Sequence, residues 1–297
     1  TKAHSLKPRT LFDYRSECDR YIRPALGNLP LQNVTPHRIQ QVLNGFQNEG
    51  HARVARQVYR RLSQALDLAV RWDWLAVNPC RKVDNPVYRP KRKVMWTLEE
   101  MRVFLEGTHD HWLYPMWLTA IGTGCRLGEL LALTWDDVDL SAETLSVTKS
   151  VQTLDGERVV TTPKTASGVR TLSIPPEVVQ VLKRHQAVQA EQRLRMGKRW
   201  EGEDLVFTSR AGEPLHQSTV QWTMHGECDR LELPRLTPHG LRHLHASVLL
   251  SEGLSIPDVS RRLGHASPAI TMTTYAHVVT ADDRGAAEAI GRALGVG

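Results

Sequence analysis

Residues 122–139 read GTGCRLGELLALTWDDVD. A glycine-rich turn leads here into an apolar helix, with Arg126 at the start of the helix and Glu129 three residues later on the same side. Helix N-termini attract anions, and arginine binds phosphate through two parallel hydrogen bonds. The stretch therefore predicts a helical segment with a candidate anion site at Arg126, where Glu129 could orient a basic group. Taken alone, however, it is better explained as a capping turn with an exposed arginine.

Short alternating segments follow this stretch and predict a small β structure. Residues 144–153 and 158–162 alternate in strand fashion around the turn pair Asp155-Gly156, and residues 169–173 form a third candidate strand. Lys164 lies between the last two of these strands. A lysine there can serve as a proton donor if its surroundings lower its pKa, although a hairpin lysine is more often simply solvated.

A third segment, residues 237–243, reads TPHGLRH. Thr237 is predicted to cap a helix that starts at Pro238, and His239 and Arg242 then share one face of that helix. This places an imidazole beside a guanidinium at a second helix N-terminus. The nearby histidines lack the H-E-x-x-H spacing, and the segment contains no carboxylate, so the pattern argues against a zinc site.

The fourth segment, residues 263–267, reads LGHAS and contains His265. Tyr275 follows ten residues later, near the end of the chain. A lone tyrosine in such a position usually serves only packing. The four segments together still form one ordered set of charged and nucleophilic side chains, Arg…Lys…His-x-x-Arg…His…Tyr.

The chain before these segments reads as helical. Residues 8–22 form one candidate helix that Pro24 and Gly27-Asn28 are expected to end. Thr35 caps a second helix, and residues 52–74 show an apolar stripe at three- and four-residue steps. Basic side chains on the last of these helices lie mostly away from the stripe, where they would follow a DNA backbone or form an ordinary solvated face. They are Arg53, Arg56, Arg60 and Arg61.

Charge and composition agree with a two-part chain. Residues 1–94 hold 18 basic and 7 acidic residues, a net +11, whereas the remainder holds 20 and 25, a net −5. The basic front part favours a nucleic-acid partner over a merely solvated surface. Residues 84–93 look like an extended strap against phosphates or an inert tether, and their basic residues are Arg89, Lys91, Arg92 and Lys93.

Other classes of protein are disfavoured by the bulk sequence. No apolar run approaches the ~20 residues of a membrane span, and the N-terminus has no apolar signal-peptide core. The four cysteines are far apart and form no C-x-x-C pair, so we expect neither a zinc site nor a disulfide framework. A reducing cytoplasm is the simplest location.

The residue set and its order resemble the tyrosine recombinases, in particular their phage and conjugative-element integrases. The quoted stretch at 122–139, PKTASGVRTL at 163–172, HGLRH at 239–243, LGH at 263–265 and Tyr275 carry the resemblance, which covers about residues 96–279. Residues 5–80 are less specifically similar to the helical core-binding domain of that family.

The resemblance implies a mainly α fold with a small antiparallel β-sheet: an all-α N-terminal DNA-binding domain and an α+β catalytic domain. We expect a core-type DNA-binding domain at 1–83, a basic linker at 84–95, the catalytic domain at 96–279 and a C-terminal tail at 280–297. The tail carries a short apolar helix pattern and is expected to dock on a neighbouring subunit or in cis. Such integrases often carry a small arm-binding domain before the core-binding domain, and no segment of this sequence resembles it. We therefore expect either a truncated integrase or a natural two-domain integrase.

The resemblance also implies the chemistry. Arg126 and Arg242 clamp the scissile phosphate, Tyr275 attacks phosphorus to form a 3′-phosphotyrosyl link, and Lys164 protonates the departing 5′-oxygen. Two arginines take the place of a metal, so no cofactor is expected.

Two histidines complete this implied site. His239 and His265 hydrogen-bond the phosphate, His239 also helps to move the tyrosine proton, and Glu129 orients Arg126 or His239.

The implied partners are double-stranded DNA attachment sites, a homotetramer on two duplexes, and DNA-bending accessory or directionality proteins. No membrane association is expected, and the location is the cytoplasm of a bacterial host, with the nucleoid when DNA is bound. The alternatives are a host chromosome-dimer resolvase, and then a type IB topoisomerase or a catalytically inactive DNA-binding regulator.

Overall fold

The computed structural model describes residues 6, 8–89, 94–162, 168–202 and 204–275. The chain divides into two compact units, Thr1–Arg92 and Lys93–Gly297, which we describe separately. Predictions that concern Lys164, the basic residues Lys91 to Lys93 and the C-terminal tail lie outside the described residues. In the described part of the chain, no helix has the length and apolar character needed to cross a membrane.

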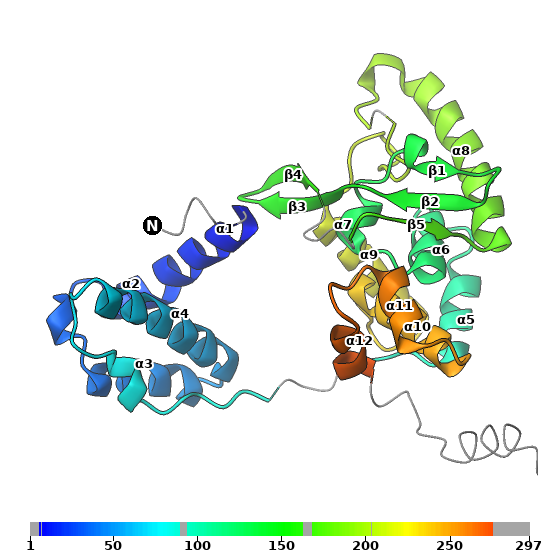
Figure 1. The fold of residues 1–297 in the computed structure, drawn as a ribbon. Helices are drawn as coiled ribbons and strands as arrows, with labels where there is room; N and C mark the ends of the chain where they lie inside the picture. Colours follow the sequence, from blue (N-terminus) through cyan, green and yellow to red (C-terminus); the bar gives the residue numbers. More distant parts are fainter. Residues whose placement is uncertain (1–5, 7, 90–93, 163–167, 203, 276–297) are drawn as a thin grey trace, which may run out of the picture. The chain divides into compact units, whose positions relative to one another are not determined.

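The first unit is helical, as predicted, and its main helices are labelled in Figure 1. Its elements are α1 (Pro8–Glu17), a π turn (Cys18–Ile22), α2 (Arg23–Leu26), a 3-10 turn (Leu31–Asn33), α3 (Pro36–Asn48), α4 (Ala52–Arg71) and a 3-10 turn (Pro79–Lys82).

The core of the first unit follows from the apolar stripe of α4. The side chains at the predicted spacing, among them Val58 and Leu62, are buried against Ile39 and Leu43 of α3. The Thr35 hydroxyl accepts a hydrogen bond from the backbone N–H of Arg38 at 3.4 Å, which confirms the predicted cap of α3.

Of the two expected helix ends, Pro24 is wrong and Gly27 is confirmed, since Gly27 is the C-cap residue of α2. The helical path continues from α1 through the π turn Cys18–Ile22 into α2, and it ends only at Leu26. Pro24 lies in the first turn of α2, where a helix needs no N–H donor from it, so the proline starts a helical segment here instead of ending one.

The second unit is an α+β unit with two small antiparallel sheets (Figure 1), as the expected fold class requires. Its helices are α5 (Leu98–Gly107), α6 (Tyr114–Thr123), α7 (Leu127–Leu130), α8 (Pro176–Met196), α9 (Gln217–Arg230), α10 (Pro238–Ser251), α11 (Ile256–Leu263) and α12 (Pro268–Tyr275), with 3-10 turns at Trp135–Asp137 and Gly197–Arg199. Its strands are β1 (Val138–Asp139), β2 (Thr144–Val147), β3 (Ser150–Leu154), β4 (Glu157–Thr161) and β5 (Arg170–Ser173).

The strand pairing differs from the prediction of one strand over residues 144–153. The chain breaks between Val147 and Ser150, so that β2 pairs with β5 and β1, whereas β3 forms a separate hairpin with β4. Alternation along a strand reports which side chains face inward, but it does not report which strand is the neighbour. The predicted turn at Asp155-Gly156 closes the β3–β4 hairpin, and both residues have positive φ angles, 53° and 84°.

Helix α10 lies in the interior of the second unit. It packs against α6, and consecutive side chains from Leu241 to Ala246 are buried. A helix buried on several sides carries its polar residues into the core, where they must find partners. This placement brings Arg242 and His243 to the interior side of a cleft, whose lining also includes the exposed His239.

Candidate active site

One cleft of about 620 Å³ in the second unit brings the predicted groups together. Its walls come from the start of α7, the β3–β4 hairpin, α10, the turn after α11, and α12. The lining includes all the predicted site residues of the described part of the unit: Arg126, Glu129, His239, Arg242, His265 and Tyr275. These residues come from separate segments, 126–129, 239–242 and 265–275, so the meeting of the segments is a property of the fold.

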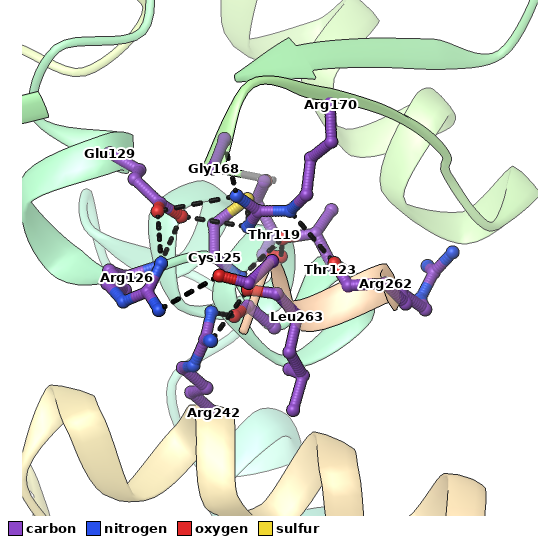
Figure 2. Close-up of polar contacts among 12 residues, drawn as sticks. Thr119, Thr123, Cys125, Arg126, Glu129, Gly168, Arg170, Arg242, Arg262 and Leu263 are labelled. Atoms are coloured by element: carbon purple, nitrogen blue, oxygen red, sulfur yellow. Dashed lines mark hydrogen bonds and ion pairs between the residues drawn. The ribbon is translucent and has the colours of Figure 1, made fainter. Parts of the chain in front are cut away.

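Arg126 occupies the N-cap position of α7 with Glu129 behind it (Figure 2). The Glu129 carboxylate accepts a hydrogen bond from the Arg126 backbone N–H at 2.9 Å and one from Nη1 at 2.8 Å. The Arg126 side chain is 40% exposed, whereas that of Glu129 is 4% exposed. The carboxylate therefore holds the guanidinium while leaving part of it open to the cleft.

Arg170 of β5 is a second partner of Glu129 that sequence reasoning missed (Figure 2). Its Nη2 lies 2.9 Å from Glu129 Oε2, its Nε donates to the Arg262 carbonyl at 2.8 Å, and its Nη1 donates to the Gly168 carbonyl at 3.1 Å. Arg170 lies two residues before the buried Leu172 on β5, so both side chains point to the same face of the strand. A charged residue on the inward face of a strand was the sequence signal that could have identified Arg170 as a site residue.

The electrostatics of this buried group follow from its partners. Burial alone would raise the pKa of Glu129, but hydrogen bonding and the charge of Arg170, followed by those of Arg126, outweigh it and lower the pKa. Glu129 is therefore an anion at neutral pH, and it offsets two cations at the edge of the cleft.

We expect Arg170→Met to lower the free energy of unfolding by about 3 kcal/mol, because breaking a buried ion pair leaves a buried charge incompletely paired. Chemical denaturation measures this change. The control is Arg193→Met, which breaks an exposed pair with Asp204 at 3.2 Å and should change the stability little. Equal effects of the two substitutions would show that the Arg170–Glu129 pair is not a structural requirement.

Arg242 is 2% exposed and is held by backbone carbonyls. Its Nη1 donates to the Gly124 carbonyl at 2.9 Å and its Nη2 donates to the Leu263 carbonyl at 2.6 Å, so it joins the turn before Arg126 to the end of α11 (Figure 2). Burial, and then the charge of Arg126, lower the pKa of Arg242 to about 10, and the side chain therefore stays charged at neutral pH.

Gly124 has a structural reason to be glycine. Its φ is +66°, and a Cβ there would lie 2.5 Å from the His245 ring. Any other residue would be strained and would displace α10 from the turn that holds Arg242.

His265 follows the left-handed Gly264 that ends α11. Its Nδ1 lies 2.7 Å from the Thr271 hydroxyl, which fixes the ring. Burial, and then the charges of Arg242 and Arg126, lower the pKa of His265 to about 4. The ring is therefore neutral at neutral pH, and it offers a hydrogen bond rather than a charge.

Tyr275 ends α12 and is 2% exposed. Its hydroxyl lies 2.6 Å from Nδ1 of His243, and the His243 ring contacts the His239 ring at a centroid distance of 4.6 Å. Burial raises the pKa of Tyr275 to about 12, against the opposing effect of the Arg242 charge. Sequence reasoning gave His243 no role in the site, and its contact with Tyr275 was missed.

The neighbouring His245 faces another part of the interior. Its Nδ1 lies 2.7 Å from the Ile121 carbonyl, and Arg262 Nε lies 3.1 Å from its Nε2. Among the described residues, no group of three or more His, Cys, Asp or Glu is arranged to hold a metal ion.

A helical unit followed by an α+β unit with this arginine, histidine and tyrosine cleft defines the class of tyrosine-type DNA recombinases. Residues 95–281 match the profile of the phage integrase family, and residues 1–85 match that of the phage integrase central domain. The chain belongs to the phage integrase family. It is a site-specific DNA recombinase of the tyrosine type, which confirms the expected enzyme class.

Known proteins are similar over nearly the whole chain. A "Tyrosine recombinase XerC-like" protein of Caldanaerobacter subterraneus subsp. tengcongensis is 30% identical, over 96% of this chain and 78% of its own length. The ICEBs1 integrase of Bacillus subtilis is 30% identical, over 88% of this chain and 70% of its own. The structure of the Tn1549 transposon integrase with transposon right-end DNA shares the fold, with a TM-score of 0.79, 22% identity and coverage of 96% and 94%.

Proposed function

We propose that this recombinase is the integrase of a phage or mobile element, which cleaves and rejoins DNA at attachment sites through a 3′-phosphotyrosyl link to Tyr275. The observation that carries the proposal is the meeting of Arg126, Arg242 and Tyr275 in one cleft. The similar ICEBs1 integrase and the fold shared with the Tn1549 integrase support the integrase class.

The two arginines supply the positive charge of the reaction. Arg126 and Arg242 bind the non-bridging oxygens of the scissile phosphate and stabilise the negative charge that develops as the pentacoordinate state forms. Their positions are set before DNA binds, since Glu129 holds the first and the carbonyls of Gly124 and Leu263 hold the second.

The remaining groups handle hydrogen bonds and protons. His239 and His265 line the cleft and hydrogen-bond the phosphate, and His265 does so as a neutral ring. Lys164 donates a proton to the departing 5′-oxygen. The phosphotyrosyl ester conserves the energy of the broken bond, so the strand can be rejoined without a cofactor.

Recombination between two duplexes requires four strands to be cut and resealed. With one tyrosine in each chain, four subunits are needed, and we therefore propose a homotetramer on two DNA duplexes. DNA-bending or directionality proteins would assist it.

Trapping the covalent intermediate tests the proposal. The protein is incubated with a nicked suicide duplex that contains an attachment site, the mixture is run on a denaturing gel, and the linked peptide is identified by mass spectrometry. We expect a 3′-phosphotyrosyl link at Tyr275. Tight DNA binding without any covalent adduct would instead indicate an inactive DNA-binding regulator.

A chromosome-dimer resolvase is the second candidate, because the XerC-like relative is as similar to this chain as the ICEBs1 integrase. The two functions differ in their substrates. An integrase recombines the junctions of the element in which its gene lies, whereas a chromosome-dimer resolvase recombines a site on the host chromosome. Preference for the second substrate in a plasmid recombination assay would favour the resolvase.

The first unit carries a prediction about DNA affinity. We propose that residues 1–83 bind the core site, and Arg53, Arg56 and Arg60 are exposed on α4. Arg61 is engaged within the unit, with Glu17 at 2.7 Å and over the Tyr14 ring at 3.3 Å. We expect the variant in which all three exposed arginines are replaced by Gln to bind DNA more weakly. The slope of log K against log salt should become less steep by about one for each phosphate that the variant no longer neutralises.

The control for this change is Arg9→Gln, since Arg9 is also exposed but lies on α1. Fluorescence anisotropy at several salt concentrations measures both slopes. An unchanged slope in the triple variant would show that this face of α4 does not contact phosphates.

The role of Lys164 is tested by the leaving group. We expect Lys164→Ala to cleave ordinary DNA poorly but to recover most of its rate on a substrate with sulfur at the 5′-bridging position, because a thiolate leaves without protonation. Arg126→Ala should recover less, because its defect is in charge stabilisation. Equal defects of Lys164→Ala on both substrates would rule out the role of general acid.

A further inference from the structure

His243 is a buried, titratable residue of the cleft to which the proposed mechanism gives no role. It lies one helical turn after His239 on α10, and its Nδ1 is 2.6 Å from the hydroxyl oxygen of Tyr275. Both residues line the cleft that contains Arg126 and Arg242. The contact therefore joins the proposed nucleophile directly to an imidazole nitrogen.

The chemistry of Tyr275 requires such a neighbour. With a pKa of about 12, the phenol is protonated at neutral pH, and a neutral hydroxyl is a weak nucleophile. A general base must be within hydrogen-bond reach of the proton that it removes, at about 2.6–3.2 Å between heavy atoms. The His243–Tyr275 contact satisfies this condition before DNA is bound.

The other histidines have different partners in the structure. His265 Nδ1 is bound to Thr271, and His245 is held by the Ile121 carbonyl and by Arg262. His239 packs edge to face on the His243 ring. The 2.6 Å contact therefore distinguishes His243 as the histidine beside the hydroxyl of the proposed nucleophile.

We propose that His243 is the general base of strand cleavage and accepts the proton of Tyr275 as its hydroxyl attacks phosphorus. The inference rests on the proposed role of Tyr275 as nucleophile. The 2.6 Å contact fits a resting form that the proposal requires, in which the hydroxyl donates to an unprotonated Nδ1 and the ring proton is on Nε2.

The step balances without any further reactant. The Tyr275 oxygen forms a bond to phosphorus, its proton moves to His243 Nδ1, and the bond from phosphorus to the 5′-oxygen breaks. The leaving oxygen takes its proton from the general acid. In the reverse reaction, the imidazolium returns its proton to the phenolate as the strand is rejoined. The imidazolium forms near the positive charge of Arg242, and the negative charge of the bound phosphate offsets the repulsion between these two cations.

The test separates basicity from positioning. His243→Asn keeps a hydrogen-bond acceptor near the position of Nδ1 but cannot take up a proton at neutral pH, and His243→Ala removes both properties. We expect both variants to form the phosphotyrosyl adduct about 100-fold more slowly than the native chain, in line with the loss of a general base. A rate near that of the native chain for His243→Asn would overturn the inference.

Fluorinated tyrosine provides a readout that a structural role would not change. Incorporating 3,5-difluorotyrosine at position 275 lowers the phenol pKa and reduces the need for a base. We expect it to accelerate adduct formation by His243→Asn and to change the native chain much less. His245→Asn is the matched control, on the same helix but away from the tyrosine, and its rate should respond to fluorination as the native chain does. Absence of a selective acceleration in the His243 variant would contradict the proposal.

A measurement on the unsubstituted protein covers the case in which the variants fold poorly. Nitrogen-15 NMR of labelled histidines reports the tautomer of each ring, and the proposal requires His243 to be unprotonated at Nδ1. A proton on Nδ1 in the native chain would overturn it. If the native chain forms no adduct at Tyr275, the proposed function fails. If it forms that adduct and His243→Asn matches it, only this inference fails.

Discussion

Replacing Tyr275 with phenylalanine is expected to abolish covalent capture of DNA while leaving DNA binding intact. The substitution removes the nucleophilic oxygen but keeps the ring, which packs in a small core with Ala246, Val259 and Leu263. Loss of the nucleophile from a covalent mechanism lowers the rate on the order of 10⁶-fold, which places the adduct below detection. A nicked suicide substrate on a denaturing gel measures capture, and a native gel measures binding.

The fold should survive this change, because the hydrogen bond to His243 is worth only about 1 kcal/mol. Tyr59→Phe is the matched control: it removes the same atom in the first unit, where the hydroxyl donates to the Cys80 carbonyl at 3.4 Å. The control should form normal amounts of adduct. Any adduct formed by Tyr275→Phe would assign the nucleophile to another residue.

The second large effect is expected for Arg242→Lys, which should slow strand cleavage about 100- to 1,000-fold. Arg242 uses two nitrogens to bind the carbonyls of Gly124 and Leu263, and a planar guanidinium can do this while it also faces the cleft. A lysine ammonium cannot span the two carbonyls in the same way. Burial would also favour loss of its charge, which the reaction needs.

Single-turnover cleavage of the suicide substrate measures this effect, and circular dichroism shows whether the helices remain. Arg235→Lys is a suitable control, since Arg235 precedes the same helix but is exposed and pairs with Asp229 at 2.6 Å. We expect the control to cleave normally. Near-normal cleavage by Arg242→Lys would exclude a bidentate arginine clamp at this position.

Several local features could be predicted because their causes lie within a few residues of sequence. The Thr237 hydroxyl accepts a hydrogen bond from the Gly240 backbone N–H at 3.2 Å, which confirms the predicted cap of α10. The apolar spacing of α4 likewise follows from the period of the helix itself. Predictions of this kind depend on side chains that the same element brings together.

Periodic patterns within single elements were sufficient to predict the helical character of the first unit, and the order of the chemical groups was sufficient to indicate the recombinase class. The tertiary structure decided which groups meet: Arg170 with Glu129, and His243 with Tyr275. It also decided that β2 and β3 belong to different sheets. The physical reason is that helical and strand periods report which face of an element is buried, whereas partners separated by 32 or 41 residues are chosen by the packing of the whole unit.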